Sequence, residues 1–153
     1  MSEAVIDVLG DRVCGGAITI PYDVSTRRSV LSITHAGHPL PDKNGLAGTK
    51  KILSVLDNVS NNDLVFVLIS GGGSALMPLP MKGITLAEKQ KITSTLLASG
   101  ASIDEINVIR KHLSAIKGGR LAQILGKGST LISLIISDVV GDRIDIIASG
   151  PTA

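Results

Sequence analysis

Short apolar runs alternate along the chain with stretches in which apolar residues recur at helical spacing. The runs at 64–69 and 131–136 are bounded by turn-forming residues and are much shorter than the ~18 apolar residues expected of a membrane helix. Short apolar runs of this length, the second of them interrupted only by Ser133, are typical of strands buried on both faces of a parallel sheet. Two further strands are predicted at 14–20, where Pro21 ends the run, and at 29–34.

Helices are predicted between these strands, because apolar residues return there every three or four positions. Two helices begin with a capping box, Thr85 to Glu88 and Ser102 to Glu105, in which a hydroxyl and a carboxylate each satisfy a free backbone N–H. The second capped helix is predicted to continue through Ile116 to a pair of glycines. The predicted helices cover residues 1–9, 44–59, 85–99, 102–117 and 120–125. This alternation predicts an α/β fold, with a three-layer Rossmann-like arrangement around one parallel sheet.

Three glycines between two serines follow the strand at 64–69. The loop consists of Ser70, Gly71, Gly72, Gly73 and Ser74. Ligands of open α/β sheets bind outside the carboxyl ends of the strands. Glycine lets a ligand approach the backbone, and successive N–H groups can form a nest for an anion. We therefore interpret the loop as a candidate phosphate site, although a tight turn whose glycines serve only the fold explains the motif equally well.

The second capped helix places polar side chains on one face. At 100° per residue, Asn107, Arg110 and Lys111 lie together beside an apolar face. Lys117 and Arg120 follow around the glycine pair. Arg110, Lys111, Lys117 and Arg120 thus form a candidate cationic cluster for phosphate. The alternative is a solvated helix surface with ordinary charges.

Asp138 and Asp142 come just after the strand at 131–136, at the sheet edge where the glycine loop is expected. Carboxylates in such a place can hold Mg²⁺ with its waters. Capping of a following helix by Asp142 is an equally good interpretation. The loop after the second strand carries His35 and His38, but metal sites normally need three or four ligands, so we favour a shaped loop beside the site.

Composition narrows the classes of partner. Aromatic residues make up 1% of the chain, so stacking platforms for single-stranded nucleic acid are missing. The net charge of +2 comes without a polybasic run, and we expect a small anionic molecule as the partner, with no nucleic acid and no membrane. Cys14 is the single cysteine and cannot form an internal disulfide. Since no signal-peptide pattern is present, we expect a cytoplasmic protein.

The chain only partly matches two familiar nucleotide-binding motifs. Gly71-x-Gly73 lacks the third small residue of the dinucleotide fingerprint, because Leu76 stands at that position. Residues 126–129 (Gly-Lys-Gly-Ser) contain the lysine of a phosphate-binding loop but precede a strand instead of a helix, and Leu121 stands where the first glycine is needed. We predict a turn at 126–129 and no bound dinucleotide.

Five ordered motifs stand at 36–42 (Ala-Gly-His-Pro-Leu-Pro-Asp), 68–76, 106–122, 136–142 and 148–152 (Ala-Ser-Gly-Pro-Thr). Taken together they resemble the glycerate 2-kinase family, whose members carry a C-terminal MOFRL domain and were often labelled hydroxypyruvate reductases. The resemblance covers nearly the whole chain. It implies ATP-dependent, Mg²⁺-assisted phosphorylation of D-glycerate to 2-phosphoglycerate, on two α/β domains with the site in the cleft between them.

The candidate residues found in the sequence fit this reaction, and each has an expected role in it. The expected roles are catalysis for Arg110 and Lys111, substrate binding for Asn107 and His38, phosphate or nucleotide binding for Lys117 and the loop Ser70 to Ser74, and metal binding for Asp138 and Asp142. Two other function classes stay open. One is an NAD(P)-dependent hydroxypyruvate reductase, against which the failed fingerprint argues, and the other is a protein that binds an anion without catalysis.

The resemblance also bears on the extent of the domain. Residues 1–153 resemble the central part of the family's N-terminal α/β domain, without the upstream strand and Gly-Lys-Ala segment and without the MOFRL domain. We therefore expect a domain truncated at both ends, which does not turn over glycerate by itself. Uncovered apolar surface is expected to make it self-associate.

Overall fold

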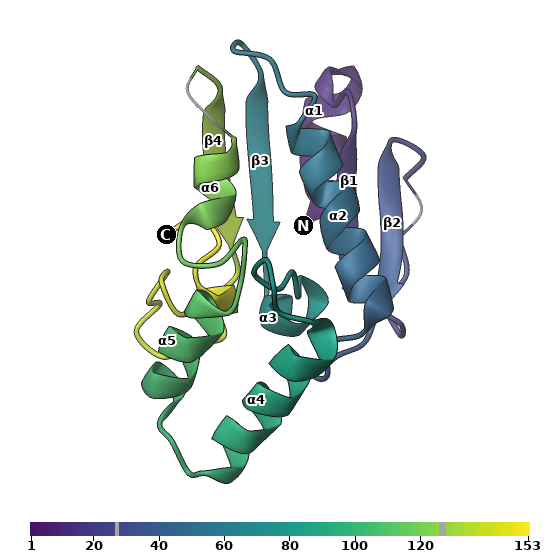
Figure 1. The fold of residues 1–153 in the computed structure, drawn as a ribbon. Coiled ribbons are helices and arrows are strands. Elements are labelled where there is room, and N and C mark those ends of the chain that lie inside the picture. The colour runs from purple at the N-terminus through teal and green to yellow at the C-terminus, as the bar shows by residue number, and fades with distance from the viewer. Residues whose placement is uncertain (27, 126–127) are drawn as a thin grey trace.

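The structure is a computed structural model that describes residues 1–26, 28–125 and 128–153. Strands and helices alternate as the pattern predicts (Figure 1). The strands are β1 (Gly16–Pro21), β2 (Leu31–Ala36), β3 (Leu64–Ile69) and β4 (Thr130–Ile135). The helices are α1 (Ser2–Leu9), α2 (Lys43–Leu56), α3 (Gly73–Leu76), α4 (Leu86–Ala98), α5 (Ile103–His112) and α6 (Arg120–Ile124), with 3-10 turns η1 (Gly10–Arg12) and η2 (Ile147–Ser149). The turn predicted at 126–129 begins at two residues that lie outside the described ones.

The strands pair in parallel, which confirms the predicted α/β class. Ile18 of β1 lies opposite Ile33 of β2, and Phe66 of β3 lies opposite Ile132 of β4. The structure differs from the prediction in one respect: the four described strands form two separate two-stranded sheets instead of one. Residues of both β1 and β3 line a groove of about 920 Å³.

In the described part of the chain, β1 and β3 are not paired with each other, so each has one unpaired edge. Exposed strand edges are templates for pairing with another strand. The expected self-association therefore has a structural basis in this groove, and it stays a prediction.

Helix α2 packs on β1 and β2 and lies in front of them in Figure 1. Asp42 caps its first turn, since Asp42 Oδ1 accepts a hydrogen bond of 2.8 Å from the backbone N–H of Gly45. Thr49 of this helix is fully buried, and Gly48 lies against Thr19 of β1 and Thr34 of β2. A second oxygen of Asp42 accepts from the N–H of Gly37 at 2.9 Å, so one carboxylate holds both the helix start and the loop after β2.

The capping boxes at Thr85 and Ser102 are both present, as predicted. The prediction that the second capped helix continues through Ile116 is wrong, because α5 ends at His112. Beyond that point the chain pairs with the segment before α4: Ser114 forms an antiparallel bridge with Pro80. Helix α3 was not predicted. None of the described helices is long and apolar enough to cross a membrane.

The carboxyl ends of β3 and β4 lie side by side. Ile69 is opposite Ile135, and the N–H of Ile136 donates to the carbonyl of Ile69 at 2.9 Å. The loops that follow therefore leave the sheet next to each other, as the sequence predicted. In Figure 1, α4 and α5 extend beyond this end of β3 and frame the region below it.

Candidate anion-binding site

The glycine loop lies against two segments that are far away in the sequence. A methyl group added to Gly71 would lie 2.6 Å from Asp138 Oδ2, and one added to Gly72 would lie 2.7 Å from the His38 ring. The missing side chains therefore let Asp138 and His38 approach the backbone closely. The structure brings three predicted parts of the site together: the glycine loop, His38 and Asp138.

The far end of the loop is tied to α5 by a chain of polar groups. The hydroxyl of Ser74 lies 2.9 Å from that of Ser149, which in turn donates to Asn107 Oδ1 at 3.4 Å. Asn107 and Ser149 are both buried, and a methyl group on Gly73 would lie 2.8 Å from the Ala148 side chain. Asn107 thus orients the segment at 148–149 against the loop.

The backbone at Ala148 and Ser149 is strained. Both residues have positive φ, 52° and 61°, which is unusual for residues with a side chain. Hydrogen bonds from the neighbouring turn hold them: Lys117 Nζ donates to the carbonyl of Ala148 at 2.8 Å, and the N–H of Gly118 donates to the carbonyl of Ser149 at 3.1 Å. Strain of this kind persists only where the surroundings enforce it, and it clusters at functional sites.

Three cationic side chains from different segments lie near this strained turn. Lys117 is 1% exposed and Lys89 of α4 is 5% exposed, while Arg110 of α5 is partly buried. Burial, followed by the charges of Lys89 and Arg110, lowers the pKa of Lys117 to about 7. Burial, followed by the charge of Arg110, lowers the pKa of Lys89 to about 8. Burial also lowers the pKa of Arg110.

The other two members of the predicted cationic cluster are engaged elsewhere. Lys111 Nζ lies 3.2 Å from Asp145 Oδ2, and Arg143 shares the same carboxylate. Arg120 donates to the carbonyls of Lys111, Ser114 and Lys117, so it stabilises the turn after α5. Both side chains are thus engaged within the protein, whereas the sequence interpretation treated them as available to bind phosphate.

Sequence reasoning missed two residues of the site. Lys89 is the most buried residue of α4. It lies at helical spacing from Leu86 and Leu96, on the side of the helix that faces the protein. A lysine among the inward-facing positions of a helix indicates a buried cation, and the sequence could have shown this. Ser149 gave no comparable signal, since its burial depends on contacts with residues more than forty positions away.

The residues proposed for metal binding are only partly placed together. Asp138 is exposed and lies beside Gly71, while Asp142 is exposed in a turn with φ of 50°. Among the described residues there is no group of three or more acidic, histidine or cysteine side chains that could hold a metal ion. Because Mg²⁺ is commonly held by one or two carboxylates and the phosphates of a substrate, Asp138 fits such an ion better than Asp142.

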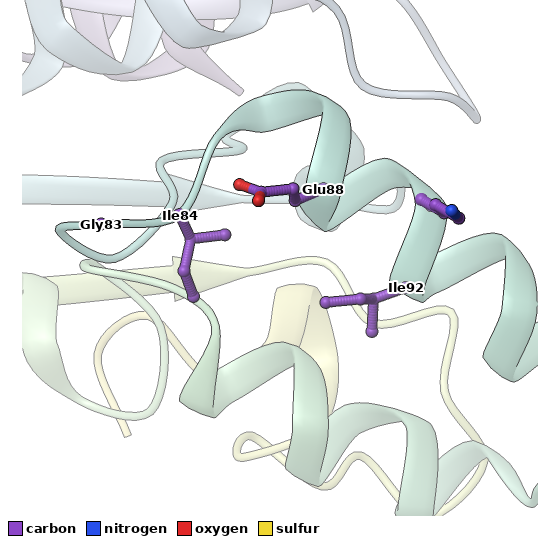
Figure 2. Close-up of a pocket in the computed structure, with 5 residues that line it drawn as sticks. Gly83, Ile84, Glu88 and Ile92 are labelled. Carbon is purple, nitrogen blue, oxygen red and sulfur yellow. The ribbon is translucent and has the colours of Figure 1, made fainter.

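A hollow of about 240 Å³ beside α4 is not part of this site (Figure 2). Its lining includes Ile84, Glu88 and Ile92. The carboxylate of Glu88 is already bound, because it accepts from the N–H and the hydroxyl of Thr85 at 2.8 and 2.7 Å. Among the described residues that line the hollow, Lys91 is therefore the one whose side chain is left with free polar groups, and a single exposed lysine does not make a site.

The role of Gly72 can be tested against a matched glycine. Gly72 and Gly83 both have positive φ, 82° and 89°, but no atom lies within 4 Å of the methyl position at Gly83. We expect Gly83→Ala to cost about 1 kcal/mol of unfolding free energy, from backbone strain alone. Gly72→Ala should cost about 1–3 kcal/mol more, because its methyl group meets the His38 ring. Urea unfolding measures both.

Equal losses in the two variants would show that Gly72 serves only the turn. His38→Ala in the Gly72→Ala background is the further control, since removal of the ring should recover the additional loss.

The fold and the arrangement of the site define an α/β protein whose site lies at the carboxyl ends of parallel strands. The family described as "Domain of unknown function (DUF4147)" matches residues 1–153, and the chain belongs to this family. The chain is 47% identical over 152 residues to D-glycerate 2-kinase of Thermotoga maritima, a match that covers 99% of this chain and 36% of that relative. It is 43% identical over 152 residues to a putative hydroxypyruvate reductase of Agrobacterium vitis, covering 99% of this chain and 39% of the relative.

The fold is also that of a solved structure. The crystal structure of glycerate kinase from Thermotoga maritima matches with a TM-score of 0.93 at 46% identity, covering 99% of this chain and 37% of that one. The family resemblance predicted from the sequence motifs is thus confirmed. The chain spans between 36% and 39% of the length of these relatives.

Proposed function

We propose that a protein containing this chain transfers a phosphoryl group from ATP to D-glycerate and forms 2-phosphoglycerate, with residues 1–153 as part of its N-terminal α/β domain. The observation that carries the proposal is the convergence of Lys89, Arg110 and Lys117 at the turn that also holds the glycine loop. Phosphoryl transfer depends mainly on positioning and on neutralising charge, and this arrangement supplies both. The names of the relatives support the same reaction.

The residues take distinct roles in this proposal. Arg110 neutralises charge that develops on the transferred group, and Lys117 and the glycine loop bind phosphate. Asn107 positions the strained turn, and His38 faces the substrate from the loop after β2. Asp138, with Asp142 four residues further on, is the carboxylate that would hold Mg²⁺, which supplies charge neutralisation between phosphates when it is bound.

Lys111 has a different environment from Arg110. Its ion pair with Asp145 already compensates its charge, so we propose that it supports the end of α5 and acts on the substrate only weakly. The reductase alternative is favoured by the names of two relatives, both putative hydroxypyruvate reductases of Agrobacterium vitis. Leu76, which takes the place of the third small residue of a dinucleotide fingerprint, is buried, and this argues against that alternative.

A chimaera tests the proposal directly. In it, this chain replaces the matching segment of the Thermotoga maritima relative, to which it is 47% identical. We expect the chimaera to form ADP from ATP in a manner that depends on D-glycerate. We expect the 153 residues alone to form almost none, because they match only 36% of the length of that relative and phosphoryl transfer needs a complete, water-excluding site.

Two controls keep the result unambiguous. The Thermotoga maritima protein itself shows the rate expected of a working site, and NADH with hydroxypyruvate tests the reductase reaction. Oxidation of NADH by the chimaera without glycerate-dependent ADP formation would overturn the proposed function. A chimaera that folds but catalyses neither reaction would favour anion binding without catalysis.

A further inference from the structure

Lys89, Arg110 and Lys117 come from three different parts of the fold and influence one another. Lys89 lies on α4, Arg110 lies on α5, and Lys117 lies in the turn before α6. The charge of Arg110 lowers the pKa of both lysines, and the charge of Lys89 lowers the pKa of Lys117. The fold thus holds three like charges together, which is unfavourable unless a compensating group is present.

No compensating carboxylate contacts these three side chains in the described part of the chain. Lys89 Nζ has one distant partner, the carbonyl of Leu79 at 3.5 Å, and Lys117 Nζ donates to the carbonyl of Ala148 at 2.8 Å. An ammonium group has three donors, so both lysines have donors to spare. Lys111, by contrast, pairs with Asp145.

The position of Lys89 is fixed by its neighbours. Leu79, whose carbonyl accepts from Lys89, also accepts from the hydroxyl of Ser114 at 3.1 Å. On the other side, Gln90 donates to the carbonyl of Pro41, in the loop that carries His38. A buried cation held in this way, without a counter-ion, is costly for the fold, and a bound anion would remove that cost.

The charge indicates which anion fits. A single carboxylate such as that of glycerate carries one negative charge and would leave most of the positive charge uncompensated. A phosphate dianion carries two charges and has oxygens that a guanidinium can bind in a bidentate manner. Lysines on either side of such a group act as point charges.

We propose that Lys89, Arg110 and Lys117 together bind one phosphate group, with Lys89 as a phosphate-binding residue supplied by α4. The proposal rests on the proposed function in one point. The molecules expected to carry this phosphate group, ATP and 2-phosphoglycerate, are those of the proposed reaction. It adds a residue that neither the family motifs nor the glycine loop includes.

Binding of a dianion at this place must be accompanied by uptake of protons. Above about pH 7, Lys117 is largely neutral, and above about pH 8 so is Lys89. The charged groups that face Lys117 are Lys89 from α4 and Arg110 from α5, and both favour its neutral form until an anion arrives. A bound dianion favours the charged form and draws protons onto the lysines.

The test uses the purified chain and isothermal titration calorimetry. Inorganic phosphate, 2-phosphoglycerate, ADP and D-glycerate are titrated at about pH 8, where phosphate is mainly a dianion. We expect Lys89→Met to weaken phosphate binding by at least about tenfold, since it removes a charged hydrogen bond. Lys91→Met is the matched control, because Lys91 is exposed on the same helix and should leave the affinity within about twofold.

Sulfate does not change its protonation in this pH range. Any protons taken up when sulfate binds are therefore taken up by the protein. In buffers of different ionisation enthalpy, we expect uptake of about one proton or more per sulfate at pH ~8.5 and almost none at pH ~6. Lys117→Met should reduce the uptake at pH ~8.5. Methionine retains the length of the apolar stem, and circular dichroism of each variant shows whether it folds.

The outcomes separate this proposal from the proposed function. Phosphate binding that Lys89→Met leaves unchanged, absence of phosphate binding at tens of millimolar, or equal losses in Lys89→Met and Lys91→Met would each overturn it. Phosphate binding that depends on Lys89 would uphold it even if the chimaera had no kinase activity. An active chimaera with unchanged activity after Lys89→Met would overturn it while the proposed function stood.

Discussion

Replacement of Lys117 by methionine should make the protein more stable at neutral pH and at the same time weaken its binding of phosphate. Lys117 is 1% exposed and its pKa falls to about 7 in the folded protein, from 10.5. Below about pH 7 the folded protein holds a buried charge, and methionine removes the cost of burying it. The lost hydrogen bond to the carbonyl of Ala148 offsets only part of this gain.

The sign of the pH dependence follows from proton binding. Between about pH 7 and pH 10.5, the unfolded chain still holds a proton on Lys117 that the folded protein has lost. The stability of the unsubstituted protein should therefore rise with pH in this window, by about 1.4 kcal/mol per unit for one proton. The advantage of Lys117→Met should be largest below pH 7 and should shrink as the pH rises.

Urea unfolding at a series of pH values measures this difference. Lys91→Met is the control, because an exposed lysine carries no burial cost and its removal should leave the pH slope unchanged. A Lys117→Met variant that is less stable than the unsubstituted protein at pH ~6, or that has the same pH slope, would contradict the argument.

Replacement of Arg110 by alanine should lower the rate of phosphoryl transfer in the chimaera by about 10²–10³, the usual cost of removing one donor that stabilises charge in a transition state. Arg110 is partly buried, and none of the described side chains pairs with its guanidinium. Arg110→Lys should lose less, because it retains the charge but not the bidentate geometry. Steady-state kinetics should show the loss mainly in kcat.

Lys111→Ala is the matched control on the same helix. The sequence interpretation gave Lys111 the same catalytic role as Arg110, but the charge of Lys111 is already compensated by its ion pair with Asp145. Partly exposed pairs contribute little, so we now expect a loss below about threefold. A loss in Lys111→Ala as large as that in Arg110→Ala would restore the original interpretation of both residues as catalytic.

Most of the elements could be predicted because their signals are local. The range of β3 agrees residue for residue with its apolar run, since a short run of six apolar residues bounded by turn-forming residues is typical of a strand in a parallel sheet, although only Ile69 at its end is buried. The capping boxes at Thr85 and Ser102 are made within four residues each, and both are present. The end of α5 could not be predicted, because Ser114 leaves the helix to pair with Pro80.

The candidate site was predictable in its outline. Loops after parallel strands meet at one edge of a sheet, and this rule alone brought Asp138 to the glycine loop. The approach of His38 to Gly72 needed the tertiary structure, because β2 and β3 belong to different strand pairs whose relative placement no local pattern encodes.

The sequence by itself determined the class of fold, the strand–helix order and the family, because periodicity, caps and ordered motifs are properties of neighbouring residues. Only the tertiary structure decided which cations converge. Arg110 and Lys111 are adjacent and look alike in the sequence, yet one is unpaired among the described residues and the other contacts Asp145. Lys89 joins Lys117 across 28 residues, because burial and charge compensation depend on contacts between segments that folding alone brings together.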